Sequence, residues 1–245
     1  MKGKTVFLII LLTFFLFLSC STAEETNEEE IHLPTDSKNI MPSDFEYLGA
    51  FLTPEPNPVN DSLMWEWGAQ AMAFNPLGNP NASRDFFQGS LFGTGHDVWN
   101  LVSEISIPQP IISPSKSLED LNTSKSLQPF ANLREGLFEW IDEMPRVGME
   151  ILPAMGDQAT SKLYLCWGQH IQDAHPSHMW CELDLQNPNP QGEWFVNGLN
   201  PYNSNDYLFK IPVQWANQYT PGLRLATGRF RDGGWSGFGP TLAAI

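Results

Sequence analysis

The pattern of apolar and polar positions divides the chain into three stretches. An unbroken apolar run covers residues 5–18 and follows two lysines, Lys2 and Lys4. A polar, acidic stretch without periodicity covers residues 20–43. From residue 44 to 245, short apolar or alternating runs recur between Pro, Gly and Asn residues. This last pattern is typical of an all-β protein built from many short strands.

The runs that predict strands cover residues 47–52, 70–74, 90–96, 101–107, 149–152, 162–170, 180–185, 206–211 and 223–229. Helical turns are expected only around residues 133–142 and 212–218. These two segments are too short to change the class.

The runs also repeat in order. AMAFNPLG, SLFGTGHD and VSEISIP, within residues 71–108, return in degenerate form as GMEILPAMG, KLYLCWGQH and WCELDL, within residues 148–185. A third, partial copy comprises LRLATGR and GPTLAAI, within residues 223–245. Three-strand units at this spacing predict the blades of a β-propeller, and a β-sandwich is the alternative. The chain holds about three such units and closed propellers carry four to eight, so we expect a partial or unusual propeller that is incomplete at its C-terminus.

Residues 1–19 are expected to be a bacterial lipoprotein signal peptide. Their apolar run is too short for a transmembrane helix, and a charged start precedes it. Leu18-Ser19-Cys20 resembles the lipobox, so Cys20 is the expected lipid-attachment site, with a simple cleaved signal or an uncleaved anchor as alternatives. Ser21 favours the outer membrane over inner-membrane retention. The acidic residues that follow predict a tether over residues 20–43, and they also resemble a surface-export signal.

Net charge bears on the partners of the protein. The formal net charge is −15, and removing the signal peptide takes away two of the 13 basic side chains and none of the 28 acidic ones. Such a balance repels phosphate backbones and anionic headgroups. We therefore expect no nucleic-acid binding, and membrane association through the lipid alone.

The chain has three cysteines, so a lipidated Cys20 leaves Cys166 and Cys181 as a pair. They flank a polar loop between two expected strands, and a disulfide across that hairpin is the first interpretation for an oxidising compartment. Two free buried thiols are the second. Zinc bound by Cys166, Cys181, His170 and His178 is the third, although the close ligand pairs usual at zinc sites are missing. We otherwise expect neither a metal nor a cofactor.

His96 and His170 end matching strands of the first two repeats, and Arg229 holds the same place in the third. If propeller blades bring these strand ends around one axis, a neutral His as general base and an Arg as carboxylate clamp would suit proton removal beside a uronic acid. The alternative is that the three side chains cap strand ends. Asp97 and Arg231 lie in the adjoining loops and are candidate ligand-binding residues.

Aromatic residues suggest a second kind of site. The nine tryptophans either fill the space between sheets or provide platforms for sugar rings. Trp235 lies in a glycine-rich segment that would let a loop approach a ligand closely, so it is the best candidate platform. The sequence contains no GxGxxG, phosphate-loop, HExxH or GxSxG motif.

Taken together, YLGAF, AFNPLG, SLFGTGHD, LYLCWGQH, WCELDL, DYLFKIP and LATGRFRDGGWSGFGP resemble a family of uncharacterised bacterial secreted proteins with propeller-like repeats. The resemblance covers nearly everything from residue 45 onward and implies the fold, but it carries over no catalytic role. The expectation is an envelope lipoprotein that binds an extracellular ligand such as a glycan. A propeller-type polysaccharide lyase or hydrolase and a protein-interaction scaffold are the alternatives.

Overall fold

A computed structural model describes residues 40–55, 59–80, 86–139, 146–168, 175–196, 204–230 and 240–245. The chain divides into two compact units, Met1–Tyr47 and Leu48–Ile245. In the described part of the first unit, a 3-10 turn, η1 (Pro42–Asp44), begins where the Asp44 carboxylate accepts a hydrogen bond from the Met41 amide at 2.7 Å. The sheets and cavities described below belong to the second unit.

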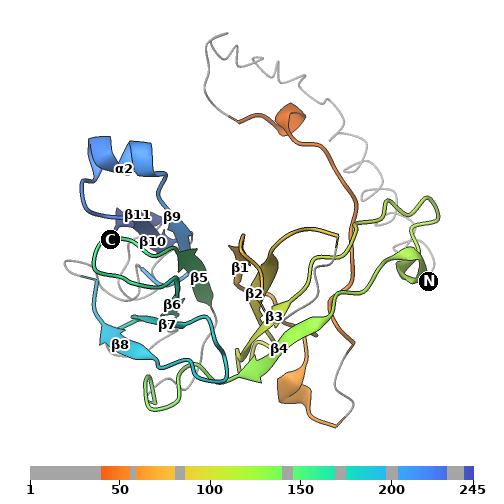
Figure 1. Cartoon of the computed structure of the whole chain (residues 1–245), viewed down its shortest axis with the longest axis horizontal. Helices are drawn as coiled ribbons and strands as arrows, with labels where there is room; N and C mark the ends of the chain where they lie inside the picture. Colours follow the sequence, from red (N-terminus) through yellow and green to blue (C-terminus); the bar gives the residue numbers. More distant parts are fainter. Residues whose placement is uncertain are drawn as a thin grey trace, which may run out of the picture. The chain divides into compact units, whose positions relative to one another are not determined.

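Three antiparallel sheets make up the second unit (Figure 1). The first sheet contains β1 (Met72–Asn75), β2 (Ser90–Thr94), β3 (Val102–Ile105) and β4 (Ser126–Ala131). The second contains β5 (Val147–Leu152), β6 (Lys162–Trp167), β7 (His178–Glu182) and β8 (Gln191–Trp194). The third contains β9 (Tyr207–Lys210), β10 (Leu225–Arg229) and β11 (Thr241–Ala244). Each strand pairs with the next along the chain, so every sheet is a meander.

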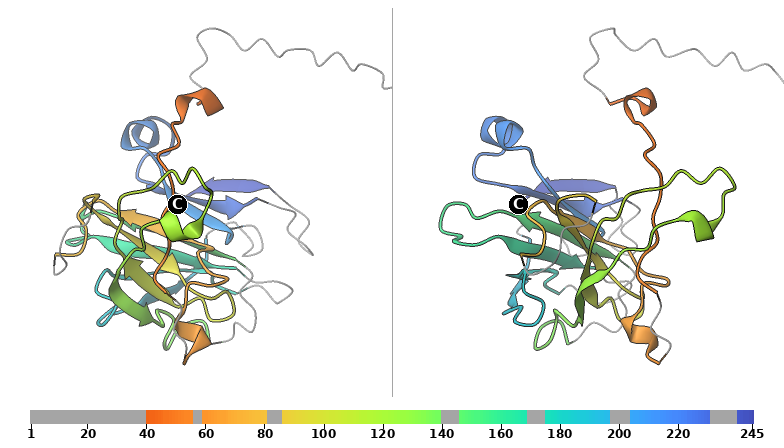
Figure 2. Two further views of the ribbon diagram at one scale, coloured as in Figure 1. Left: turned by 90° about the vertical axis from the view of Figure 1, so that its right-hand side faces the viewer. Right: turned by 45° about the vertical axis from the view of Figure 1, so that its right-hand side comes forward.

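Helical structure is sparse among the described residues. Of two more 3-10 turns, η2 (Asp61–Leu63) precedes β1 and η3 (Leu118–Asp120) lies between β3 and β4. One short helix, α2 (Val213–Tyr219), connects β9 to β10. Ala216 of α2 packs with Ile211 and Ala226, so the helix covers part of the third sheet (Figure 2). No helix in the described part of the chain is long and apolar enough to cross a membrane.

The sheets approach one another mainly through their first strands. β5 lies between β1 and β9 and contacts both (Figure 1). Because successive side chains of a strand point to opposite faces, β5 packs against the first sheet with one face and against the third sheet with the other. Met149 and Ile151 face the first sheet, where they join a buried cluster with Phe92 and Leu163. This cluster is the largest apolar core of the unit.

The opposite face of β5 packs against the third sheet. Cys166 and Leu152 form a second apolar cluster with Leu208 of β9 and Leu225 of β10. Gly148 permits this approach, because a Cβ there would lie 2.6 Å from the Cys166 sulfur and 2.7 Å from the Leu208 amide nitrogen. The third sheet could not pack this closely if residue 148 carried a side chain.

The all-β class predicted from sequence is confirmed, and most predicted strands are present. The predicted three-strand repeat is corrected: the first two sheets each have a fourth strand, β4 and β8, which the sequence pattern did not reveal. Residues 47–52 form only isolated bridges at Ala50 and Leu52, rather than the expected strand. Residues 133–139 form turns instead of a helix.

Candidate functional site

A polar cleft lies between the first and second sheets. Its walls come from the β1–β2 turn, β3 and β4 on one side, and from the segments before β6 and after β7 on the other. Its volume is about 820 Å³, within the range of ligand-binding clefts. The polar side chains that matter most are Asn79, Glu104, Gln128, Glu182, Asp184 and Asn187. The cleft thus offers amides and carboxylates in one place.

Glu104 is the buried centre of this cleft. Only 1% of its surface is exposed, and its carboxylate accepts three hydrogen bonds from neutral donors. Ser90 Oγ donates to Oε1 at 2.5 Å, while Asn79 Nδ2 and Gln128 Nε2 both donate to Oε2 at 2.7 Å. Hydrogen bonds to a carboxylate are stronger than those between neutral groups. Glu104 therefore holds the Asn79 and Gln128 amides in fixed orientations.

Gln128 connects the two walls of the cleft. It lies opposite Glu104 in the β3–β4 register, and its Nε2 also donates to the Leu183 carbonyl at 2.8 Å. Its Oε1 accepts from the Leu185 amide at 2.8 Å. One side chain of the first sheet therefore satisfies two backbone groups that follow β7 of the second sheet. This network fixes the width of the cleft at its base.

The rim of the cleft is acidic. Hydrogen bonds from the Asn187 side chain and the Gln186 amide lower the pKa of Asp184, which is fully exposed and stays charged at neutral pH. Glu182 pairs with Lys162 and accepts from Thr160 Oγ1 at 3.2 Å. Carboxylates on both the base and the rim repel anionic ligands. The arrangement suits hydroxyl groups, which donate to carboxylates and accept from amides.

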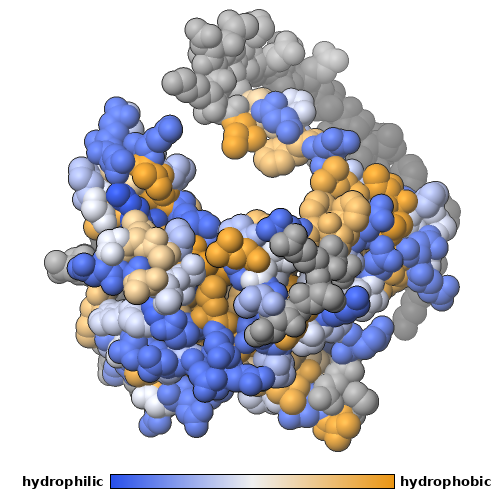
Figure 3. Space-filling view, viewed as in Figure 1, coloured by the Kyte–Doolittle hydropathy of each residue, from blue (hydrophilic) through white to orange (hydrophobic). Residues whose placement is uncertain are grey.

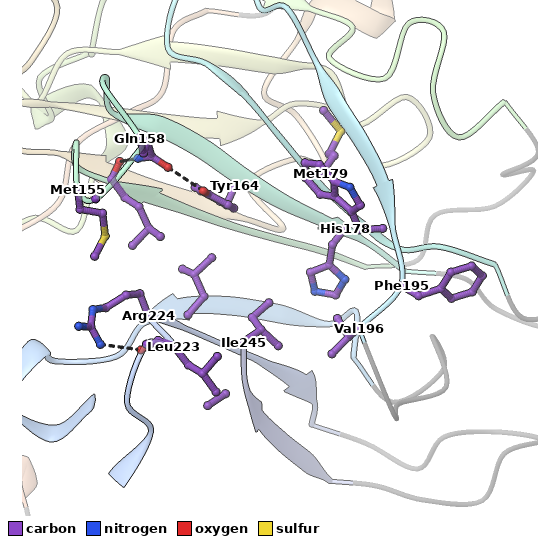
Figure 4. A pocket seen from close by; sticks show the side chains of 16 residues that line it. Met155, Gln158, Tyr164, His178, Met179, Phe195, Val196, Leu223, Arg224 and Ile245 are labelled. Atoms are coloured by element: carbon purple, nitrogen blue, oxygen red, sulfur yellow. Dashed lines mark hydrogen bonds between the residues drawn. The ribbon is translucent and has the colours of Figure 1, made fainter. Parts of the chain in front are cut away.

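A second cavity, of about 730 Å³, lies between the second and third sheets (Figure 4). Apolar and aromatic side chains dominate its lining, including Met155, Tyr164 and Ile245, and the Tyr164 hydroxyl donates to Gln158 Oε1 at 2.7 Å. Few polar groups point into this space, so it suits an apolar ligand better than a hydroxylated one.

His178 belongs to the wall of this second cavity, and its two ring nitrogens have defined partners. Nε2 lies 3.0 Å from Thr227 Oγ1, and Nδ1 lies 2.9 Å from Ser177 Oγ. Thr227 Oγ1 gives its hydrogen to the Ser204 carbonyl at 2.6 Å, so it accepts from His178 Nε2. Burial lowers the pKa of His178 to about 4. The ring is therefore neutral at physiological pH, with its proton on Nε2.

His96 caps a turn directly after β2. Its Nδ1 accepts a hydrogen bond from the Val98 amide at 3.2 Å, and its ring contacts Trp99 with 4.8 Å between centroids. Asp97 Oδ1 lies 3.1 Å from the same nitrogen. These contacts match the capping interpretation of the strand ends. The neighbouring candidate Asp97 is half exposed.

Arg229 is buried, contrary to the role expected of a carboxylate clamp. Its side chain is 1% exposed, and its Nε lies 3.4 Å from Asp206 Oδ2, whose side chain is fully buried. The register of β9 and β10 extends to these two residues, so they form a cross-strand ion pair. The guanidinium of Arg229 is paired with Asp206 inside the third sheet and is not accessible to a ligand in solvent.

The predicted equivalence of His96 and Arg229 also needs correction. Thr94 shares its face of β2 with core side chains packed on the second sheet, and Thr227 faces the second sheet through His178. The second sheet follows the first but precedes the third. Thr94 therefore faces the sheet that follows its own, whereas Thr227 faces the sheet that precedes its own. The sequence alignment of residues 94–96 with 227–229 is thus out of register by an odd number of residues.

The remaining sequence-predicted candidates lie outside the described residues. They are the lipid-attachment site Cys20, the third strand-end residue His170, and the loop residues Arg231 and Trp235. The arrangement of His96, His170 and Arg229 around one axis stays a prediction.

The predicted disulfide is contradicted. Both Cys166 and Cys181 are free and buried, and the β6–β7 register pairs Cys166 with His178 and Cys181 with Leu163. The two thiols are therefore displaced by three residues along the ladder and lie on opposite faces of the sheet. Cys166 packs toward the third sheet and Cys181 toward the first. Side chains on opposite faces cannot form a disulfide without rearrangement of the backbone.

The same geometry separates the proposed zinc ligands. Cys166 and Cys181 cannot bind one ion from opposite faces, and burial raises the pKa of both thiols to about 12. Within the described ranges, no group of three or more His, Cys, Asp or Glu side chains is arranged to hold a metal ion.

Comparisons with protein-family models, curated proteins and solved structures found no match to this chain.

Proposed function

We propose that the protein is a lipid-anchored envelope protein that binds a neutral, hydroxylated ligand, such as a glycan, in the cleft between the first and second sheets. The observation that carries this proposal is the buried Glu104 carboxylate, which orients the Asn79 and Gln128 amides at the base of the cleft. This network fixes the base of the cleft, and the more exposed Glu182, Asp184 and Asn187 side chains above it provide the donors and acceptors that sugar hydroxyls require.

Charge restricts the class of glycan. Glu104, Glu182 and Asp184 all line the cleft, and the chain carries a net charge of −15. A uronic-acid polymer would meet carboxylates at the base and at the rim of the site. The burial of Arg229 gives no support to the lyase alternative, which needs a cation to hold the uronate carboxylate. The favoured ligand is therefore an uncharged oligosaccharide.

The cellular setting rests on the sequence. The signal peptide, Cys20 and the acidic tether favour attachment to the outer membrane of a bacterium. The three meandering sheets, packed through their first strands, favour the view that they are blades of a β-propeller. Substitution Cys20→Ala is expected to move the protein from the membrane fraction to the soluble fraction, and retention in the membrane would contradict lipid anchoring.

Isothermal titration calorimetry with neutral hexasaccharides, namely cello-, laminari-, xylo- and mannohexaose, tests binding, with polygalacturonate as the anionic comparison. We expect at least one neutral probe to bind and polygalacturonate not to bind. Asp184→Ala and Asn187→Ala should each weaken binding at least tenfold. Asp120→Ala is the matched control, since Asp120 is another exposed carboxylate whose pKa is lowered by local hydrogen bonds, and it lies outside the cleft.

Binding that survives both cleft variants would place the site elsewhere. Binding of polygalacturonate alone would overturn the charge argument, and no binding to any probe would argue against a glycan ligand.

A further inference from the structure

The second cavity, between the second and third sheets, opens to solvent past large apolar side chains. Met155 and Leu223 of its lining are 36% and 39% exposed, and Trp194 and Phe195 are 42% and 59% exposed. Figure 3 shows apolar side chains among hydrophilic ones at the surface below α2, where these two sheets meet. Large apolar side chains that stay exposed around a cavity usually mark a binding site.

The neutral polar side chains of this cavity are already paired within the protein. The Tyr164 hydroxyl donates to Gln158 Oε1 at 2.7 Å, and Gln158 Nε2 donates to the carbonyls of Leu152 and Pro153 at 3.2 and 2.9 Å. Both ring nitrogens of His178 are paired with neighbouring hydroxyls. Because these groups have their partners, the walls offer a ligand apolar contact rather than new hydrogen bonds.

Arg224 is the exception in this lining. Figure 4 places it beside Met155 at one end of the cavity, with Phe195 and Val196 toward the other end. The guanidinium donates to the Leu223 carbonyl and to Asn217 Oδ1, both at 3.0 Å and both neutral. Its Nε is buried and has no hydrogen-bond partner among the described residues. A guanidinium has five N–H donors, so it can still bind an anion.

The charge of Arg224 is not neutralised by a neighbour. In the described part of the chain, no carboxylate forms an ion pair with it, although the net charge of the chain is −15. The described lining of the cavity contains no Asp or Glu side chain either. A single cation at one end of an apolar space is complementary to a ligand with one anionic group and an apolar body.

We infer that this cavity binds a linear aliphatic monocarboxylate of the fatty-acid class. The carboxylate accepts hydrogen bonds from the Arg224 guanidinium, and the alkyl chain lies along Tyr164 and Ile245 toward Phe195 (Figure 4). The volume of about 730 Å³ is within the range of small-molecule sites. This second site is separate from the polar cleft and does not depend on the proposed glycan.

Isothermal titration calorimetry on the full-length chain with Cys20→Ser tests the inference, because no attached acyl group can then enter the cavity. Dodecanoate is the probe, dodecanol tests the need for the charge, and acetate tests the need for the alkyl chain. We expect one dodecanoate to bind per chain, dodecanol to bind at least tenfold more weakly, and acetate not to bind. Failure of dodecanoate to bind, or equal affinities for dodecanoate and dodecanol, would overturn the inference.

Two matched variants locate the carboxylate. Arg224→Met keeps the apolar stem and should weaken dodecanoate binding at least tenfold without changing the affinity for dodecanol. Lys125→Met removes an exposed cation outside both cavities and should change neither affinity. With carboxyl-labelled dodecanoate, nuclear magnetic resonance should show a lower pKa of the bound carboxyl group in wild type than in Arg224→Met, because the guanidinium stabilises the carboxylate.

Equal carboxyl pKa values, or equal dodecanoate affinities in wild type and Arg224→Met, would contradict the role of Arg224. The result is independent of the polar cleft, since neutral hexasaccharides should bind wild type and Arg224→Met with the same affinity. Loss of hexasaccharide binding in both proteins would count against the proposed glycan and leave the fatty-acid site unaffected.

Discussion

The buried, neutral His178 makes the stability of the protein depend on pH in a defined way. Its imidazole donates from Nε2 to Thr227 and accepts at Nδ1 from Ser177. Protonation of Nδ1 would remove that acceptor and place a charge in a buried site. Desolvation accordingly lowers the pKa of His178 from 6.5 to about 4.

The lowered pKa sets both the sign and the size of the effect. Above about pH 6.5 the imidazole is neutral in both the folded and the unfolded state, so it does not make the free energy of unfolding depend on pH. Between about pH 6.5 and 4 only the unfolded state gains a proton, and the free energy of unfolding falls as the pH falls. A pKa difference of about 2.5, at 1.36 kcal/mol per pKa unit, gives a loss of about 3 kcal/mol by pH 4.

Urea denaturation of wild type and of His178→Gln, at intervals from pH 8 to pH 4, measures this contribution. The variant will be less stable at pH 8, because it loses shape and hydrogen bonds, so the informative quantity is the change in the difference between the two proteins. That difference should shrink by about 3 kcal/mol on going to pH 4. Parallel stability curves would show that His178 titrates normally and would refute the buried, neutral imidazole.

Two further predictions concern the packing of the second sheet. Gly148→Ala should lower the free energy of unfolding by about 3 kcal/mol in urea denaturation, because its Cβ would overlap Cys166 and β9, whereas Gly156→Ala, with open space around it, should cost only about 1 kcal/mol of backbone strain. Equal effects would contradict the close approach of the second and third sheets. In a Cys20→Ser background, Cys166 and Cys181 should not react with a disulfide reagent until the protein is unfolded, when both should react without prior reduction. Thiols that appear only after reduction would show that the disulfide exists.

The sequence pattern was sufficient for the class and for the strands with buried faces. β2, β6 and β10 contain alternating or continuous apolar residues, and each was predicted within a few positions. β4 and β8 were missed because they are edge strands in which Pro129 and Gly192 interrupt the apolar pattern. Edge strands tolerate such residues, since one side of the backbone needs no partner in the sheet.

Register explains why the predicted sites fared differently. The spacing correctly predicted that Cys166 and Cys181 lie on neighbouring strands. Whether the two thiols share a face of the sheet depends on the number of positions between them along the strand pair, and this number is odd. The same difficulty affected the alignment of His96 with Arg229. Glu104 could have been recognised from the sequence, because it lies in the middle of the apolar run VSEISIP. A carboxylate on a strand that is buried on both faces requires hydrogen-bond partners. Its partners Asn79 and Gln128 are distant in sequence and could be found only from the fold.

The most direct test of the polar cleft is a nuclear magnetic resonance titration of the side-chain amide signals with the neutral hexasaccharide that binds best. The account predicts that the signals of Asn79, Gln128 and Asn187 shift together as the probe saturates the protein, while the ring of His178 in the second cavity does not respond. Shifts confined to the second cavity, or no shift in the cleft at saturating probe, would contradict the assignment of the ligand site.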